Sequence, residues 1–227
     1  MLKFTIQPEN LKSLITAIAA ITNEIKFHFT PEGITCSSTD PAVVAMIAGE
    51  LNKSAFTEYE ADTGEIAVDI SKLDDMISDI KTPLEIELNE ESHKLQIRST
   101  GINYTMSLLS PDTIRKDPKI PALDLPGRIV ITKELFKYGA KACRKINDYV
   151  YLIISNNTFI MEGIGDTDTV SLKVPASDLV ELHGIGDTAK ALFSFDYLTK
   201  MIDSVGNNQN ITLQLGKDMP FIMVFEI

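Results

Sequence analysis

The residues whose types and spacing suggest chemistry lie in one short segment of the second half. Four lysines are spaced four residues apart, Lys133, Lys137, Lys141 and Lys145, and Arg144 lies beside them. In an α-helix this spacing puts the lysines on one face, where like charges destabilise the helix by roughly 0.2–0.5 kcal/mol per pair. A polyanion bound to that face would offset the cost, and an ordinary solvated face is the alternative interpretation.

The segment is unusual because the chain as a whole is acidic. Its formal net charge is −11 at pH 7, from 32 Asp and Glu against 21 Lys and Arg. Between Lys133 and Lys145, five basic residues stand against one acid, Glu134, which leaves +4. A net negative charge disfavours non-specific binding to nucleic acid. The local charge of this segment points the other way.

No other segment has the residue pattern of an enzyme active site. His28, His93 and His183 are scattered and form no Cys/His cluster for a metal. His28 falls on the polar side of a predicted strand and is expected to be exposed. The phrases "EGIGDT", from Glu162, and "HGIGDT", from His183, lack the Gly-Lys-Ser/Thr of a phosphate loop and predict turns or strand ends. We therefore expect no catalytic residue, no metal and no cofactor.

The elements that must position the basic segment follow from apolar periodicity. Helices are predicted to start near Glu9 and Ser71 and to cover about 133–145 and 196–205. The second has Asp74 three residues after Ser71, the spacing of a capping box. Most of the remainder alternates apolar and polar residues, which predicts strands. They cover residues 1–6, 25–30, 34–39, 42–51, 64–70, 84–89, 94–99, 102–109, 149–154, 158–163, 169–174, 191–195, 210–215 and 221–227.

The same pattern occurs twice, which predicts a duplicated domain. The phrase "LDDMI" from Leu73 returns 125 residues later as "LTKMI" from Leu198 (198 − 73). An earlier helix aligns Leu11 with Leu135, at a shift of 124. Each copy holds two helices and several strands, so it is not a short-period repeat. We expect an N-terminal domain at 1–109 and a C-terminal domain at 127–227.

Between the two copies, residues 110–126 are a predicted linker. Their sequence, "SPDTIRKDPKIPALDLP", contains four prolines, which disfavour both a helix and a central strand. An extended, exposed connection is expected. No apolar run approaches the roughly 18 residues of a membrane span, and the two cysteines, Cys36 and Cys143, are expected to be reduced core residues. These features predict a cytoplasmic protein with no membrane partner.

Five longer phrases, distributed over the chain, resemble a single family. They are "STDPAVVAM", "EYEADTGEIAVDISKL", "LLSPDTIRKDPKIPALDLPGRIVI", "FSFDYLTKMI" and "LGKDMPFIMVFEI". Together they resemble the archaeal DNA polymerase sliding clamps of the proliferating cell nuclear antigen family. The resemblance implies an α+β fold of two duplicated DNA-clamp domains, arranged in a pseudo-six-fold ring of three identical subunits. Helices would line the hole, and antiparallel sheets would form the outside.

The resemblance also implies a function without catalysis. The ring would encircle duplex DNA, without sequence specificity, and act as a processivity factor. It would tether DNA polymerase, the clamp loader and other replication and repair proteins through short peptide motifs. Such a protein would associate with the nucleoid, or with the nucleus if the host is a eukaryote.

Basic residues on the helices would then face the DNA. Carried over by position, they are Lys12, Lys72, Lys137, Lys141, Arg144, Lys145 and Lys200. The sequence departs from the family because acids occur at or near places where relatives often carry lysine. They are Asp74, Asp75 and Asp79 in the helix from Ser71, and Asp196 and Asp203 lie in the last helix. We therefore expect helix 133–145 to supply most of the positive lining.

The family's partner site is a hydrophobic pocket under the inter-domain linker, where client peptides insert apolar and aromatic anchors. The matching positions are Met46, Pro118, Ile120, Pro121, Pro220 and Phe221, with Thr39, Asp40 and Val43 at the edge. An extended proline-rich segment can also donate backbone contacts to a peptide. Many relatives continue beyond the position of Ile227, so a shallower pocket is expected here.

The resemblance places the subunit contact between strand 103–109 of one subunit and strand 169–174 of the next. The residues expected there are Tyr104, Met106, Leu108, Val170, Leu172 and Val174. Edge strands invite pairing, and a closed head-to-tail ring uses both edges.

Three other functions remain open. The chain could be one subunit of a heterotrimeric clamp, a nucleic-acid-processing enzyme, or a duplicated scaffold unrelated to DNA. Self-assembly into a ring would distinguish the homotrimer from a subunit of a heterotrimeric clamp. Nuclease activity that depends on a divalent metal would identify the enzyme.

Overall fold

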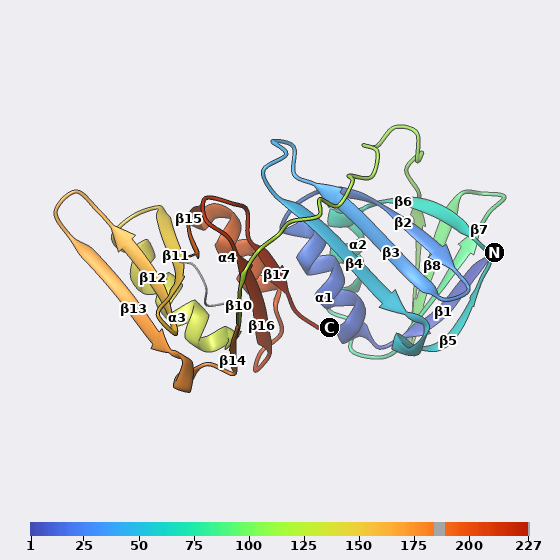
Figure 1. The fold of residues 1–227 in the computed structure, drawn as a ribbon. Helices are drawn as coiled ribbons and strands as arrows, with labels where there is room; N and C mark the ends of the chain where they lie inside the picture. Colours follow the sequence, from blue (N-terminus) through green and yellow to red (C-terminus); the bar gives the residue numbers. More distant parts are fainter. Residues whose placement is uncertain (184–188, 227) are drawn as a thin grey trace. The chain divides into compact units, whose positions relative to one another are not determined.

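Two hydrophobic cores, one in each half of the chain, organise the computed structural model, which describes residues 1–183 and 189–226. The chain divides into unit 1, Met1–Ile120, and unit 2, Pro121–Ile227 (Figure 1). The division falls inside the segment 110–126 that the sequence predicts as a linker. Each core is built from residues of its own unit alone.

Unit 1 contains two antiparallel sheets, with strand orders β5-β1-β7-β8-β9 and β4-β3-β2-β6, and two helices. In chain order its elements are β1 (Leu2–Ile6), α1 (Pro8–Ala19), β2 (Glu24–Thr30), β3 (Gly33–Thr39), β4 (Met46–Asn52), η1 (Lys53–Ala55), β5 (Phe56–Ala61), β6 (Gly64–Asp69), α2 (Ile70–Ile77), β7 (Leu84–Asn89), β8 (Lys94–Ser99) and β9 (Ile102–Ser107). An isolated bridge joins Ala67 to Leu109, just beyond β9.

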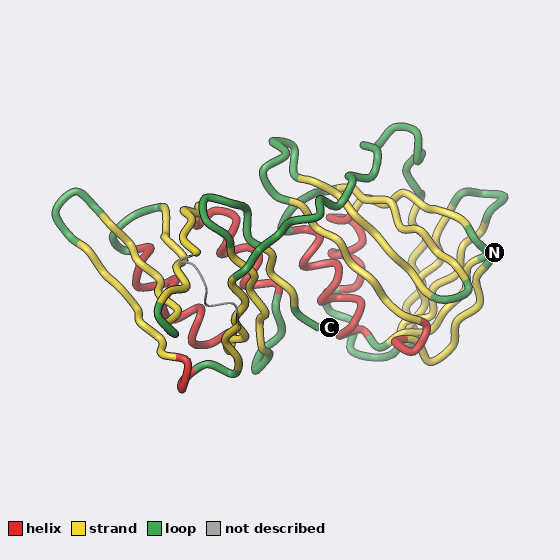
Figure 2. The backbone as a smooth tube through the Cα atoms, viewed as in Figure 1, coloured by secondary structure: helices red, strands yellow, loops and turns green. Residues whose placement is uncertain are grey.

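The helices of unit 1 cover one face of the sheet β4-β3-β2-β6. Helix α1 contacts α2 and β4, and α2 contacts β2 and β6; the paired helices are red in Figure 2. Helix α1 buries Leu11, Leu14, Ile15 and Ile18, which follow the i, i+3, i+4, i+7 spacing of a single helix face. Packing of this stripe fixes which side of α1 remains open.

Unit 2 has the same kind of architecture, with sheets β14-β10-β16-β17 and β13-β12-β11-β15 among its described residues. Its elements are β10 (Gly127–Thr132), α3 (Lys133–Arg144), β11 (Tyr149–Ser155), β12 (Thr158–Ile164), β13 (Thr169–Pro175), η2 (Ala176–Asp178), β14 (Glu181–His183), β15 (Ala189–Ser194), α4 (Phe195–Ser204), β16 (Asn210–Leu215) and β17 (Ile222–Val224). Helix α3 contacts α4 and strands β10 to β13.

The duplication predicted from the sequence is visible element by element, and its register is 125 residues. Helices α3 and α4 begin 125 residues after α1 and α2 (133 − 8 and 195 − 70), and β11 and β12 follow β2 and β3 at the same shift. The buried positions agree, since Leu11 corresponds to Phe136 and Ile18 to Cys143. The predicted alignment of Leu11 with Leu135 is wrong by one residue, because Phe136 occupies that place in the core.

Several predicted element boundaries are also corrected. Helix α2 begins at Ile70, and its N-cap is Asp69, whose side chain accepts a hydrogen bond from the backbone N–H of Lys72. Ser71 therefore lies inside the helix, and the predicted capping box is wrong. The strand predicted over 42–51 starts only at Met46, because the preceding residues form a loop.

Within the part of the chain that the structure describes, three strands have no counterpart among the strands predicted from the sequence. Strand β5 contains a pair of polar residues that interrupts its alternation, and its partner β1 has a register shift between Thr5 and Ile6. Strand β10 buries three successive apolar residues, Ile129 to Ile131, so it has no period of two. Strand β14 has only three residues. The turn predicted after His183 falls on residues 184–188, which lie outside the described part of the chain.

Both cysteines are free and buried, as predicted. Burial raises the pKa of the Cys36 thiol to about 12 and also raises the pKa of Cys143. Thiolate formation is therefore suppressed at neutral pH. Among the helices of residues 1–183 and 189–226, none is long and apolar enough to cross a membrane.

Candidate functional site

Local sequence features explain why helix α3, which carries the basic segment, begins and ends where it does. Its N-cap is Thr132, whose hydroxyl accepts a hydrogen bond from the backbone N–H of Leu135 at 3.3 Å. Glu134 lies in the first turn, and Lys141 and Arg144 lie in the last turn. These charges have the favourable signs for the helix dipole. Hydrogen bonds from its own backbone N–H and from that of Asn208 lower the pKa of the Glu134 carboxyl.

The four lysines of α3 do not form one solvent-facing row. Lys133 is only 7% exposed, and its Nζ donates to the carbonyl of Val205 and, at 3.4 Å, to Oδ1 of Asn207. Spacing alone could not reveal this, because Lys133 opens the helix and reaches back over the end of α4. The predicted ladder of four lysines is therefore wrong at its first member.

Two other cations of α3 are engaged by helix α4. Nζ of Lys137 lies 2.6 Å from Oδ1 of Asp203. The guanidinium of Arg144 donates to the hydroxyl of Thr199 at 3.0 Å and lies 3.7 Å from a carboxylate oxygen of Asp196. Lys141 and Lys145 are exposed and have no ion pair or hydrogen bond from their side chains to other described residues.

The remaining predicted DNA-facing residues are dispersed over three helices. In unit 1, Nζ of Lys12 donates to the carbonyl of Ile80 at 2.6 Å, and Lys72 lies 3.5 Å from Asp69. Lys200, on α4 of unit 2, is exposed and forms no ion pair within the described residues. The structure thus brings Lys137, Arg144 and the acids of α4 together, and leaves the other cations separate.

The partner-site residues of unit 1 centre on the loop between β3 and β4. The buried Asp40 carboxylate accepts backbone N–H groups of Ala42 at 3.0 Å, Val44 at 2.7 Å and Ala45 at 2.8 Å. Below the loop, Thr39 pairs with Met46 in the sheet. Asp40 therefore acts as an internal bracket for this loop.

The bracket holds an apolar tip outward. Val43 and Val44 are 68% and 70% exposed, and Val43 has φ 57°. A β-branched residue rarely adopts a positive φ. Strain of this kind is retained where the surrounding structure enforces it, often at functional sites.

The first part of the linker is fastened to the same loop. Arg115 donates to the carbonyls of Asp40 at 3.4 Å and Pro41 at 3.3 Å. Nε2 of His28 lies 2.7 Å from Oδ2 of Asp117, so the expectation that His28 is simply exposed is wrong. No local pattern points to Arg115, because its partners lie 74 and 75 residues away.

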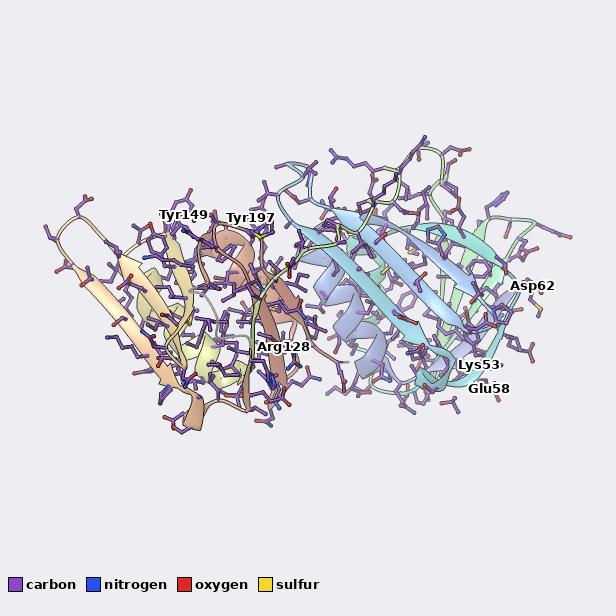
Figure 3. All side chains as sticks on the ribbon, in the orientation of Figure 1. Lys53, Glu58, Asp62, Arg128, Tyr149 and Tyr197 are labelled. Atoms are coloured by element: carbon purple, nitrogen blue, oxygen red, sulfur yellow. The ribbon has the colours of Figure 1, made fainter. Side chains whose placement is uncertain are left out.

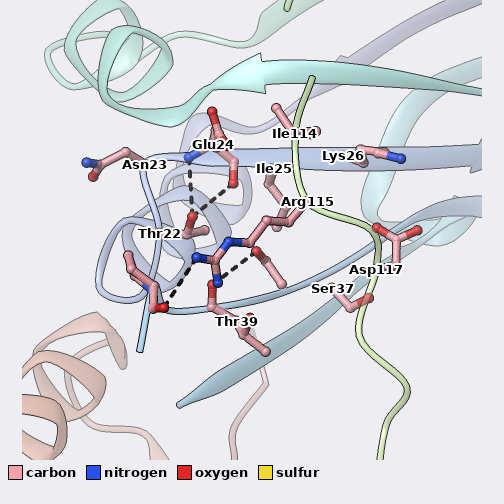
Figure 4. A pocket seen from close by; sticks show the side chains of 12 residues that line it. Thr22, Asn23, Glu24, Ile25, Lys26, Ser37, Thr39, Ile114, Arg115 and Asp117 are labelled. Atoms are coloured by element: carbon pink, nitrogen blue, oxygen red, sulfur yellow. Dashed lines mark hydrogen bonds between the residues drawn. The ribbon is translucent and has the colours of Figure 1, made fainter. Parts of the chain in front are cut away.

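These contacts border a cavity of about 260 Å³ in unit 1. Its lining combines the turn before β2, the end of β3 and the linker (Figure 4). The residues are Thr22, Asn23, Glu24, Ile25, Lys26, Ser37, Ser38, Thr39, Pro41, Ile114, Arg115 and Asp117.

The other predicted pocket residues are divided between the units. Pro118 is half-buried and Ile120 is exposed in unit 1, whereas Pro121, Pro220 and Phe221 belong to unit 2. The ring of Phe221 packs against that of Phe193, with centroids 4.7 Å apart. The complete pocket therefore stays a prediction.

Strands β9 and β13, where the sequence predicts the subunit contact, are both edge strands. Met106 and Val174 are only 2% and 3% exposed, so their side chains already pack in the core of their own unit. Tyr104, Leu108, Val170 and Leu172 are partly exposed, and Leu108 lies just beyond β9. The edges are open, and the contact itself remains a prediction.

Within residues 1–183 and 189–226, no three His, Cys, Asp or Glu side chains are grouped so that they could hold a metal ion. Asp203 and Asp196, the acids near α3, instead face the cations Lys137 and Arg144.

Repeated units of two paired helices and two antiparallel sheets define the DNA-clamp architecture. A solved structure of the C-terminal region of FEN-1 bound to A. fulgidus PCNA superimposes with a TM-score of 0.93 at 31% identity, covering 100% of this chain and 93% of that one. PCNA from Thermococcus kodakaraensis gives a TM-score of 0.92 at 18% identity, which shows the fold alone. The predicted α+β fold of two duplicated clamp domains is confirmed.

Sequence comparisons agree with the fold. Residues 1–102 match the family model described as proliferating cell nuclear antigen, N-terminal domain. DNA polymerase sliding clamps from Methanosarcina barkeri and Halobacterium salinarum are 43% and 33% identical, and each comparison covers 100% of this chain and 93% of the relative. The chain belongs to the DNA polymerase sliding clamp family.

Proposed function

We propose that three copies of this chain form a ring that encircles duplex DNA and tethers DNA polymerase and other replication and repair proteins. The observation that carries the proposal is the full-length similarity to proteins named DNA polymerase sliding clamp. The duplicated fold supports it, because three two-unit chains supply six similar units for one ring.

The open edges of β9 and β13 would join neighbouring subunits. An edge strand presents unpaired backbone N–H and C=O groups, and a head-to-tail contact between unlike edges generates a ring when the rotation closes. In that contact, main-chain hydrogen bonds would continue the sheet. The partly exposed Tyr104, Val170 and Leu172 would be covered at the join.

DNA passing through the ring would meet exposed lysines rather than base-reading side chains. Phosphate contacts carry no sequence information and weaken with salt. The exposed Lys141, Lys145 and Lys200 are suited to such contacts because no acid within the described residues pairs with them. A small number of weak contacts would let the ring move along the duplex.

Client proteins would bind through short peptides at the loop 40–45 and the linker. In the solved structure from A. fulgidus, the C-terminal region of FEN-1 is bound to PCNA, and we propose the same kind of partner here. The exposed Val43 and Val44 offer apolar surface, and Arg115 holds the linker against the loop. The clamp itself would be non-catalytic and cofactor-free, and it would act in the cytoplasm at the nucleoid.

Retention on circular DNA tests this function. The protein is loaded with its clamp loader and ATP onto a nicked plasmid, free protein is removed by gel filtration, and the plasmid is then linearised. A ring is expected to remain on the circle and to leave the linear DNA through its ends. Equal retention on both forms would mean ordinary phosphate binding and would contradict the proposal.

A further inference from the structure

Helix α4 places acidic side chains against cations of α3. Asp203 pairs with Lys137 at 2.6 Å, and Asp196 lies 3.7 Å from Arg144. At the 125-residue register, the corresponding positions of unit 1 are Ser78 and Ser71. Only the helix pair that carries the basic segment has acids at these two places.

The pairing divides the cations of α3 into two groups. Lys133 is buried, and Lys137 and Arg144 are engaged by α4. Arg144 remains exposed in its contact with α4. Tyr138, Lys141 and Lys145 are exposed and form no side-chain hydrogen bond or ion pair within the described residues. Their spacing of i, i+3 and i+7 puts them on one stripe of the helix. The +4 charge counted from the sequence is therefore reduced to two freely presented lysines.

The ion pair of Lys137 with Asp203 can affect DNA binding although it contributes little to stability. The side chains of Lys137 and Asp203 are 37% and 52% exposed, so their contribution to stability is expected to be small. Their effect on DNA is separate, because a carboxylate close to an ammonium group cancels its charge for an approaching phosphate. A phosphate that approaches Lys137 would meet the negative charge of Asp203 as well, although the ammonium has three N–H donors.

We propose that Asp203, and to a smaller extent Asp196, are positioning residues that hold Lys137 and Arg144 away from phosphates and so limit the grip of α3 on the duplex. This inference rests on the proposed function, because it assumes that α3 faces DNA. In a sliding protein, such restraint reduces the number of phosphate contacts and favours movement over tight binding.

The test is the salt dependence of duplex binding by full-length Asp203→Asn. Affinity for a fluorescent duplex is measured by anisotropy at several salt concentrations. Release of Lys137 adds a phosphate contact, so the slope of log K against log salt should steepen by about 0.9. The affinity ratio of variant to wild type should accordingly fall about 3.5-fold between 50 and 200 mM salt. Asp196→Asn should give a smaller change.

Two further variants separate this effect from general charge and from misfolding. Glu58→Gln raises the net charge equally; Glu58 is exposed on β5 (Figure 3) and has no ion pair among the described residues, so the slope should not change. Lys137→Ala in the Asp203→Asn background should restore the wild-type slope.

The outcomes distinguish the inference from the function on which it rests. A wild-type slope in Asp203→Asn, with normal DNA binding by the wild type, would overturn the inference and leave the proposed clamp intact. The same would follow if Glu58→Gln changed the slope as much as Asp203→Asn. Failure of the wild-type protein to bind duplex at any salt concentration would overturn the inference, whereas the proposed clamp stands or falls on its retention on circular DNA.

Discussion

Helices α1 and α3 occupy equivalent places in the two units and share Glu9/Glu134 and Lys12/Lys137, but the rest of their open faces differs in charge. Their buried positions match at a shift of 125 residues. On the open face, uncharged residues of α1 are replaced in α3 by an aromatic residue and three cations. The replaced positions are Ser13, Thr16, Ala19 and Ala20, which correspond to Tyr138, Lys141, Arg144 and Lys145.

The comparison shows that packing preserves which positions are buried, although not the residue type at each of them: Leu11, Leu14 and Ile18 correspond to Phe136, Gly139 and Cys143. A change of volume in a close-packed core is costly, whereas most exposed positions tolerate substitution with little effect on stability. Charge could therefore accumulate on one helix of the duplicated pair. The functional difference lies on the faces that packing does not constrain.

At the loop after β3, it is unit 1 that has the additional feature and unit 2 that lacks it. In unit 1, residues 40–45 are bracketed by Asp40 and contacted by Arg115. In unit 2, the corresponding turn between β12 and β13 comprises only residues 165–168. The turn in unit 2 is two residues shorter, so it has no room for an exposed apolar tip like the one that Val43 and Val44 form in unit 1. The exposed apolar tip is thus a feature of unit 1, just as the basic open face of α3 is a feature of unit 2.

The largest effect should come from breaking the shared core. Phe136→Ala removes a fully buried ring from unit 2 and should lower the free energy of unfolding by about 3–5 kcal/mol. Leu11→Ala, its equivalent in unit 1, should cost about 2–5 kcal/mol. Denaturant unfolding of both variants measures this. Near-wild-type stability in either would contradict the equivalence of the two positions.

A smaller loss is expected from the bracket that only unit 1 has. Asp40→Ala leaves three backbone N–H groups of the loop without their carboxylate acceptor, which should cost about 1–3 kcal/mol. It should also weaken a client peptide, because Val43 would no longer be held at positive φ. Denaturant unfolding measures the first effect, and calorimetry with the C-terminal peptide of a FEN-1 homologue measures the second. Asp166→Asn, in the shorter turn of unit 2, is the control that should leave both unchanged.

The division of charge within α3 predicts unequal lysines. Lys141→Ala combined with Lys145→Ala should reduce the salt slope of duplex binding by up to about 1.8, at about 0.9 for each lysine that contacts phosphate. Lys137→Ala should change it much less, because Asp203 already neutralises Lys137. Anisotropy measures the slopes, and light scattering checks that the assembly is unchanged. Equal effects of Lys137 and Lys141 would show that all members of the row act alike.

The smallest effect is expected from a substitution that makes the open face of α1 resemble that of α3. Thr16 is exposed at the position equivalent to Lys141, so Thr16→Lys should alter stability by less than about 0.5 kcal/mol. The salt slope should steepen by up to about 0.9. A steeper slope would mean that both helices have access to DNA. No change would restrict the contact to unit 2.

The features that depend on local pattern could be predicted from the sequence. Periodicity located the four α-helices of the described residues and most of their strands, and the recurrence of "LDDMI" as "LTKMI" revealed the duplication. Local pattern could not reveal that Lys133 is buried, because the carbonyl that accepts its hydrogen bond belongs to Val205, 72 residues away. The partners of Asp203 and Arg115 are also distant in the sequence, so no local pattern could predict these contacts. The cap at Asp69 could not be chosen locally, because Ser71 has an equally plausible cap spacing.

The solution mass of the purified chain, measured by light scattering over a range of protein and salt concentrations, shows directly whether the chain assembles into a ring by itself. A self-assembled ring predicts a species of three times the 25.1 kDa chain mass. A persistent monomer would contradict self-assembly into a ring and would favour a clamp that needs different subunits to close.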